Sequence, residues 1–195
     1  MNYILIDFEN ICPNNLELLH NHEVNVLMFV GAKQYKVPLV LASAMQEIGH
    51  AAQYVKIDSS GKNALDFYIA YYVGVLATKD PDACFYIISS DTGFDPLIKH
   101  LKSKNISIQR ELDISAIPFL SEAVATLYDD KVVEILKNFA RRPEKPKRMR
   151  TLANAIKSLF VDKLTDQQVS AIVRNLEERN YITVNNSKIT YNFPN

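Results

Sequence analysis

The chain has 195 residues, and its 22 Lys and Arg residues balance 22 Asp and Glu residues. This length suits one large domain, or one domain with a small companion. No apolar run approaches the roughly 20 residues of a membrane span, and the chain starts directly in a strand-like segment without a signal peptide. We therefore expect a cytoplasmic protein with no membrane partner.

The neutral total hides an asymmetry between the two parts of the chain. Residues 1–140 carry 11 basic and 17 acidic residues, whereas residues 141–195 carry 11 basic and 5 acidic residues. Basic segments are attracted to phosphate backbones, and clustered acids recruit divalent cations. The sequence thus predicts an acidic module joined to a basic one, although the two parts could simply attract each other.

Strand-like and helix-like segments alternate through the acidic part. Continuous apolar runs predict buried parallel strands, and the alternation is typical of βαβ units whose sheet is covered on both faces. The expected strands are 3–6, 24–30, 53–57, 85–89 and 106–109, and the expected helices are 38–49, 63–77, 96–104 and 119–139. The fold class is therefore α/β with a mainly parallel sheet.

The composition changes after residue 140. Segment 141–150 is basic and proline-rich with almost nothing to bury, which predicts a linker. Residues 151–195 then contain two expected helices, the second with a capping box at Thr165 and Gln168, and a hairpin with strands at 181–184 and 188–193. Helices followed by a hairpin resemble a compact winged helix. We expect three parts, which are a domain at 1–140, a linker at 141–150 and a winged-helix-like domain at 151–195.

Two of the expected strands end in acidic residues. Asp7 follows the strand at 3–6, and Asp91 follows the strand at 85–89. Ligands of parallel α/β sheets gather beyond the carboxyl ends of the strands, so the two carboxylates face one crevice if their strands are neighbours. Such a pair repels, and it either raises a pKa or recruits a hard cation such as Mg²⁺ or Mn²⁺.

Two further acids belong to the same hypothesis. Asp66 lies in a segment that is apolar nearly all round, which predicts a well-buried helix, and its carboxylate needs either a metal or a cation such as Lys62 as partner. Asp95 precedes Pro96, so it caps a helix, binds the metal, or does both. Supporting polar groups are Asn10, Ser89 and Ser90. Glu9 is expected to point away, since neighbouring side chains alternate.

Four segments in order resemble the motifs of the PIN-like nuclease superfamily, with its NYN-type bacterial branch as the nearest match. They are ILIDFENI (4–11), FVGAKQYK (29–36), GKNALDFYIAYYVG (61–74) and SSDTGFDPLIKHLKSKNI (89–106). The resemblance covers roughly residues 1–120 and implies a three-layer α/β/α, Rossmann-like fold. It places the family's acids on Asp7, Asp66, Asp91 and Asp95 and their polar companion on Asn10. More weakly, the tail resembles winged-helix or LOTUS-like units fused to NYN domains.

The resemblance implies a metal-dependent ribonuclease. Asp7, Asp66 and Asp91 would be the catalytic metal ligands, joined by Asp95, and the cofactor would be Mg²⁺ or Mn²⁺. RNA, or single-stranded nucleic acid in general, is the expected partner, and a homodimer is left open. Tyr35 is a candidate for stacking a base. The candidate nucleic-acid-binding residues are Lys33, Lys36, Lys62, Arg141, Arg142, Lys147, Arg148 and Arg150.

Two other functions stay open. One is a non-catalytic RNA-binding module with a vestigial acid cluster. The other is a phosphohydrolase of small phosphates, although the strand-end DxD signature is absent, since the sequence reads Asp7-Phe8-Glu9. A triad of Ser90, His100 and an acid lacks a nucleophile-elbow sequence, and the two cysteines form no CxxC motif.

Overall fold

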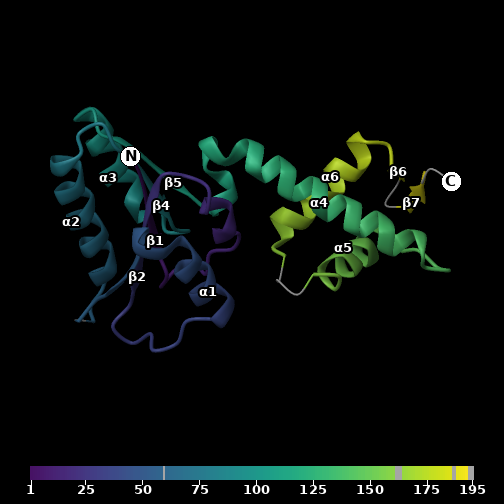
Figure 1. Ribbon diagram of the computed structural model, residues 1–195, viewed down its shortest axis with the longest axis horizontal. Coiled ribbons are helices and arrows are strands. Elements are labelled where there is room, and N and C mark those ends of the chain that lie inside the picture. Colours follow the sequence, from purple (N-terminus) through teal and green to yellow (C-terminus); the bar gives the residue numbers. More distant parts are fainter. Residues whose placement is uncertain (59, 161–163, 186–187, 193–195) are drawn as a thin grey trace. The chain divides into compact units, whose positions relative to one another are not determined.

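A computed structural model describes residues 1–58, 60–160, 164–185 and 188–192 of the chain (Figure 1). The chain forms two compact units, Met1–Ser121 and Glu122–Asn195.

The first unit contains a five-stranded parallel sheet with the strand order β3-β2-β1-β4-β5. Its strands are β1 (Asn2–Asp7), β2 (Val24–Val30), β3 (Ala52–Lys56), β4 (Cys84–Ile88) and β5 (Ser107–Glu111). The central strand β1 pairs with β4 on one side and β2 on the other, in each case parallel. The segments that follow β1 and β4 therefore leave the same edge of the sheet side by side, as the acidic crevice requires.

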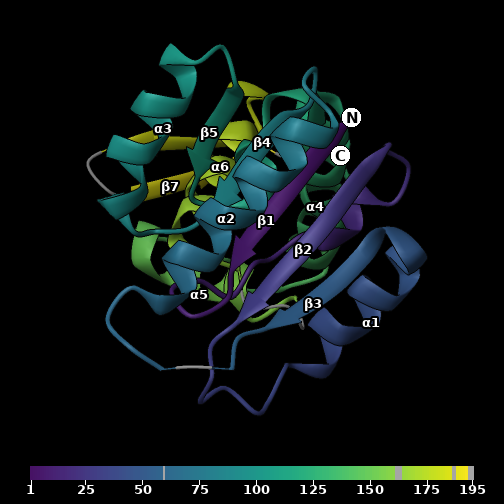
Figure 2. The ribbon, with the colours of Figure 1, turned by 90° about the vertical axis from the view of Figure 1, so that its left-hand side faces the viewer.

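Helices lie on both faces of this sheet, and the expected three-layer α/β/α fold is confirmed. They are α1 (Leu39–Ile48), α2 (Ala64–Lys79) and α3 (Asp95–Ser103). Figure 2 shows α2 in front of the sheet, and its Ile69 and Val73 join one core with the strand residues Leu5 and Phe85. Residues next to these in the strands point to the opposite face, where α1 contacts β3 and the 3-10 helix Leu16–Leu19. Further 3-10 helices are Gly49–Ala51, Thr92–Phe94, Ile114–Ala116 and Pro118–Leu120.

One face of α2 corrects a sequence-based expectation. The apolar sequence of this helix predicted burial nearly all round, but Phe67 and Tyr71 are 70 % and 66 % exposed. They lie one turn apart, opposite the buried stripe of Leu65, Ile69 and Val73. The helix is thus an ordinary one-sided sheet cover whose outer face carries aromatic residues.

In the described residues, the second unit comprises three helices and an antiparallel hairpin. They are α4 (Ser121–Ala140), α5 (Met149–Lys157), α6 (Asp166–Glu178), β6 (Ile182–Asn185) and β7 (Lys188–Tyr191). Val132 and Phe139 of α4 share a core with Ile156 of α5 and Ile172 of α6. Helix α4, which we expected to end the first domain at residue 140, therefore contributes its buried residues to the second unit, and the division falls after Ser121.

Segment 141–150, which we expected to be a solvated linker, also lies against the second unit. The Lys147 carbonyl accepts the Ile189 N–H at 3.0 Å, and Arg148 forms an antiparallel bridge with Lys188. The Tyr191 hydroxyl donates to the Pro146 carbonyl at 2.6 Å. These contacts hold the backbone of Lys147 and Arg148 alongside β7. The hairpin turn at Asn186-Ser187, together with Phe193, lies outside the described residues.

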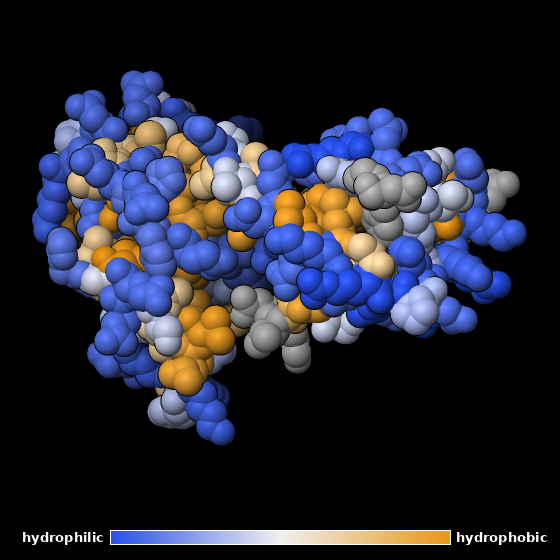
Figure 3. All heavy atoms as spheres, turned by 45° about the vertical axis from the view of Figure 1, so that its right-hand side comes forward, coloured by the Kyte–Doolittle hydropathy of each residue, from blue (hydrophilic) through white to orange (hydrophobic). Residues whose placement is uncertain are grey.

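The surface is mostly hydrophilic on the face that Figure 3 presents, with interruptions of apolar residues drawn in orange. Within the described ranges, none of the helices combines the length and the apolar character needed to cross a membrane.

Candidate active site

Asp7 ends β1 and is fully buried, with 0 % of its surface exposed. A buried carboxylate is costly unless hydrogen bonds satisfy it. Ser89 donates its hydroxyl to Asp7 Oδ2 at 2.6 Å, and the Asn10 side-chain amide donates to the same oxygen at 2.8 Å. The Asn10 backbone N–H donates to Oδ1 at 3.2 Å. Two supporting residues predicted from sequence, Asn10 and Ser89, therefore fix the orientation of Asp7.

The loop after β4 brings Asp91 to the same edge of the sheet. The Asp91 N–H donates to the Ser89 hydroxyl at 3.0 Å, so one buried serine contacts both acidic segments. Asp91 Oδ1 accepts the Gly93 N–H at 2.7 Å and caps the 3-10 helix that starts at Thr92. The exposed Ser90 makes a longer contact, 3.4 Å from its hydroxyl to the Asn10 carbonyl. Asp91 thus has a role in the turn, while its second carboxylate oxygen has no hydrogen bond to any described residue.

Asp66 lies in the first turn of α2 and is partly buried. Burial raises the pKa of its carboxyl, and the negative charges of Asp7, Asp91 and Glu9 raise that pKa further. No hydrogen bond or ion pair joins this carboxylate to another residue in the described part of the chain, Lys62 included. The structure therefore brings Asp66 into the electrostatic field of the other acids without a cationic partner.

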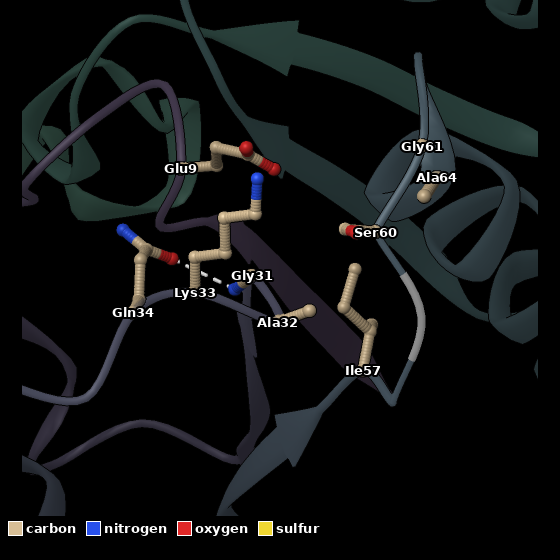
Figure 4. A pocket seen from close by; sticks show the side chains of 9 residues that line it. All are labelled: Glu9, Gly31, Ala32, Lys33, Gln34, Ile57, Ser60, Gly61 and Ala64. Carbon is tan, nitrogen blue, oxygen red and sulfur yellow. Dashed lines mark hydrogen bonds between the residues drawn. The ribbon is translucent and has the colours of Figure 1, made fainter.

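Glu9 corrects another expectation, because it does not point away from the site. Its charge acts on Asp66, and its carboxylate lines two pockets at the carboxyl edge of the sheet. The first pocket, of about 310 Å³, also includes Lys33 (Figure 4). The second, of about 640 Å³, includes Lys36 and Cys12. Glu9 is thus a fourth acid of the candidate site.

Asp95 has a different partner from those we expected. It is the first residue of α3 rather than its cap, and its carboxylate receives hydrogen bonds from Arg110 at 2.8 and 3.3 Å. Arg110 also donates to the Ser89 carbonyl at 3.2 Å. The hydrogen bond from Arg110 to the Asp95 carboxylate lowers the pKa of Asp95. The ion pair ties α3 to β5, and Arg110 in turn contacts the end of β4 at the Ser89 carbonyl, so Asp95 supports the site through Arg110.

Two residues that the sequence did not single out order the loop after β2. Gln34 donates to the Phe8 carbonyl at 2.9 Å and accepts the Gly31 N–H at 2.7 Å. Lys56 donates to the carbonyls of Gly31 and Gln34, each at 2.6 Å, and its ammonium lies 4.9 Å from the centre of the Tyr35 ring. These contacts hold the loop that carries Lys33 and Lys36 beside the segment after β1.

The predicted phosphate-binding lysines are all exposed. Lys33 and Lys36 flank Gln34 in the ordered loop, and Lys62 precedes α2. In the second unit, the Arg142 guanidinium lies 5.3 Å from the centre of the Phe139 ring, while the backbone of Lys147 and Arg148 pairs with the hairpin. Arg141 follows α4, and Arg150 lies in the first turn of α5. The basic residues therefore form two separate groups, one in each unit.

The donor set fits a hard divalent cation by its chemistry. Carboxylate oxygens are the ligands that Mg²⁺ and Mn²⁺ prefer, and a cation would relieve the repulsion among Asp7, Asp66 and Asp91. Within the part of the chain that the structure describes, however, no three His, Cys, Asp or Glu residues stand in a ready coordination geometry. The acids share one electrostatic field but would have to adjust their side chains to bind one ion.

The parallel sheet and its two helical layers define a three-layer, Rossmann-like α/β domain with acids at the carboxyl edge of the sheet. The PIN domain family matches residues 1–111, which is more than half of the chain. The chain belongs to this family, whose members are commonly metal-dependent ribonucleases. No curated protein and no solved structure matches the chain.

Proposed function

We propose that this protein is a metal-dependent ribonuclease of the NYN-type branch of the PIN-like superfamily. The convergence of Asp7, Asp66 and Asp91 at the carboxyl edge of a PIN-domain sheet carries the proposal. The Asp66 carboxylate supports it in particular, because it lies among like charges with no cation beside it in the described structure. Such an arrangement costs stability in the metal-free protein and favours the binding of a divalent ion.

The proposed roles follow from the contacts of each side chain. Asp7, Asp66 and Asp91 would hold the ion, with Glu9 nearby. A bound Mg²⁺ or Mn²⁺ supplies Lewis-acid polarisation of a phosphodiester oxygen and activation of water. Ser89 and Asn10 orient Asp7, which they contact directly. The remaining predicted acid, Asp95, acts through Arg110 on the Ser89 carbonyl at the end of β4.

Basic residues would supply affinity for the RNA backbone. Lys33, Lys36 and Lys62 surround the acidic edge and would bind phosphates next to the cleaved bond. The second unit would act as a winged helix, which its helices followed by a hairpin and the isolated Arg148–Lys188 backbone bridge support. Its helix α6 carries more acids than bases, so we place its nucleic-acid contacts on segment 141–150 rather than on that helix.

A cleavage assay tests the proposed function. End-labelled single-stranded RNA is incubated with the full chain in Mn²⁺, Mg²⁺ or EDTA, beside the variant Asp7→Asn. The matched control is Asp82→Asn, since Asp82 is exposed between α2 and β4 at the opposite edge of the sheet. We expect cleavage that needs a divalent ion, disappears in Asp7→Asn and persists in Asp82→Asn. Equal cleavage by the two variants would refute the proposal.

One observation favours a second function. The described acids form no ready three-residue metal site, as expected of an RNA-binding module with a vestigial centre. Such a module would bind RNA in EDTA, lose affinity steeply with salt and cleave with neither metal. The same assay, with a binding measurement added, separates the two functions.

A further inference from the structure

A pocket of about 310 Å³ that Glu9 and Lys33 line lies beside the acid cluster. It opens at the carboxyl ends of β1, β2 and β3, next to the start of α2. Figure 4 shows Glu9 and Lys33 pointing into it from one side, with Ala64 and Ser60 on the other. Because Glu9 also belongs to the acidic field around Asp66, the pocket directly adjoins the candidate active site.

The lining is mainly polar and includes two groups of opposite charge, Glu9 and Lys33. Ala32 and Ala64 contribute a smaller apolar part, and Ile57, almost fully buried, closes the pocket from behind. The Glu9 carboxylate is a hydrogen-bond acceptor only, and the Lys33 ammonium is a donor only. A flat ligand with both donors and acceptors on its rim matches these two groups, and an unpaired nucleobase has these properties.

The Glu9 side chain lies close to Gly31, where a larger residue would crowd it. A Cβ added at Gly31 would stand 3.2 Å from Glu9 Oε2 and 3.1 Å from Gln34 Oε1, which is tighter than nearly all real contacts. Gln34 in turn is fixed by its bonds to the Gly31 N–H and the Phe8 carbonyl. The segments after β1 and β2 are thereby packed together, and the exposed Glu9 side chain starts from this ordered junction.

We propose that this pocket binds one unpaired guanine base of the RNA strand, with Glu9 as the acceptor for its Watson–Crick edge. Guanine presents two parallel N–H donors, N1–H and N2–H, which match the two oxygens of a carboxylate. It also presents O6 and N7 as acceptors for Lys33. Adenine and cytosine offer a carboxylate only their amino groups, and uracil offers a single N–H. The inference rests on the proposed function, because that function makes RNA the substrate. The pocket would then select the base next to the cleaved bond.

Binding ratios test the inference independently of catalysis. Fluorescence anisotropy in EDTA measures the affinity of the full chain for four uridine-rich oligonucleotides. Each oligonucleotide carries one central guanine, inosine, adenine or cytosine. Repulsion from the metal-free acid cluster weakens all four equally and cancels in the ratios. We expect the guanine oligonucleotide to bind about tenfold more tightly than the adenine or the inosine oligonucleotide, since one bidentate contact discriminates by about that factor. Inosine is the closest comparison, because it differs from guanosine only in lacking the N2 amino group.

Glu9→Gln should abolish the preference of guanine over inosine, whereas Glu23→Gln should keep it. Glu23 is an exposed acid just before β2, at the opposite edge of the sheet, so its variant matches the charge change. Lys33→Met should weaken guanine binding, with Lys79→Met at the far end of α2 as its control. Equal affinities for all four oligonucleotides, or a guanine preference that survives in Glu9→Gln, would overturn the inference. Cleavage in Mn²⁺ is scored separately, so each proposal can fail without the other.

Discussion

The buried hydroxyl of Ser89 allows a quantitative test of how the site is held together. Ser89 is fully buried, donates to Asp7 at 2.6 Å and accepts the Asp91 N–H at 3.0 Å. Its neighbour Ser90 is exposed and makes one contact at 3.4 Å. Ser89→Ala and Ser90→Ala therefore remove the same atom from adjacent positions with very different surroundings.

The expected loss of stability follows from these contacts. A hydrogen bond to a charged group contributes about 1.5–3 kcal/mol, and the weaker contact to Asp91 adds about 0.5–1 kcal/mol. Ser89→Ala should therefore cost about 2–4 kcal/mol, while Ser90→Ala should stay within about 0.5 kcal/mol of the parent. For a unit of this size, 1 kcal/mol moves Tm by about 4 °C, so Ser89→Ala should lower Tm by about 8–16 °C.

Scanning calorimetry of the full chain measures the Tm of both variants and of the parent. The cleavage assay adds a second readout, in which Ser89→Ala should slow the reaction about 10- to 100-fold, as expected for loss of a group that orients a metal ligand. If both variants show the same Tm and the same cleavage rate, the Ser89 hydroxyl does not orient Asp7.

Three further predictions concern charge. Because the pKa of Asp66 is raised in the folded protein, ionisation of this carboxyl destabilises the fold as the pH rises past its ordinary value of 3.8. Asp66→Asn should therefore raise Tm in EDTA at pH 7 more than at pH 4, and an unchanged Tm at pH 7 would contradict this sign. Arg110 lowers the pKa of Asp95, so this pair stabilises the fold above the ordinary pKa of Asp95 and less as the pH falls. Arg110→Met should move the Asp95 pKa back up in an NMR titration, and a pKa that does not move would show that the pair is absent in solution. Lys147→Gln and Arg150→Gln should each reduce the slope of log affinity for single-stranded RNA against log salt concentration by about 0.7. An unchanged slope would show that segment 141–150 does not contact the RNA.

The sequence predicted the acidic edge because its signals are local. Continuous apolar runs identify parallel strands, and an acid directly after such a run must lie at the carboxyl edge. Asp7 and Asp91 were placed in this way, and the pairing of β1 with β4 confirms that their strands are neighbours. Asn10 and Ser89 were named as supporting groups for the same reason, since each lies within three residues of an acid at that edge.

The parts that could not be predicted depend on contacts between distant segments. The Asp95–Arg110 pair depends on how α3 meets β5, and the order of the loop after β2 depends on Lys56 and Gln34 reaching across it. The outer face of α2 was misjudged because aromatic residues are compatible with both core and surface. Segment 141–150 carried few apolar residues to bury, yet its backbone pairs with the hairpin, which composition cannot indicate.

Asp91 has a role in the turn and a proposed role in the chemistry, and Asp91→Asn separates these two roles. Asparagine keeps the Oδ1 atom that accepts the Gly93 N–H, but it removes the charge. Asp113→Asn is the matched control, because Asp113 accepts the Ser115 N–H at 2.9 Å in a turn of the same kind after β5.

The decisive measurement is the rate at which these two variants cleave single-stranded RNA in Mn²⁺. We predict that Asp91→Asn loses at least about a hundredfold in rate with its Tm preserved, since charge stabilisation by a held metal ion is worth several kcal/mol, while Asp113→Asn cleaves like the parent. Parental cleavage by Asp91→Asn would contradict the account and leave Asp91 with a role in the turn alone.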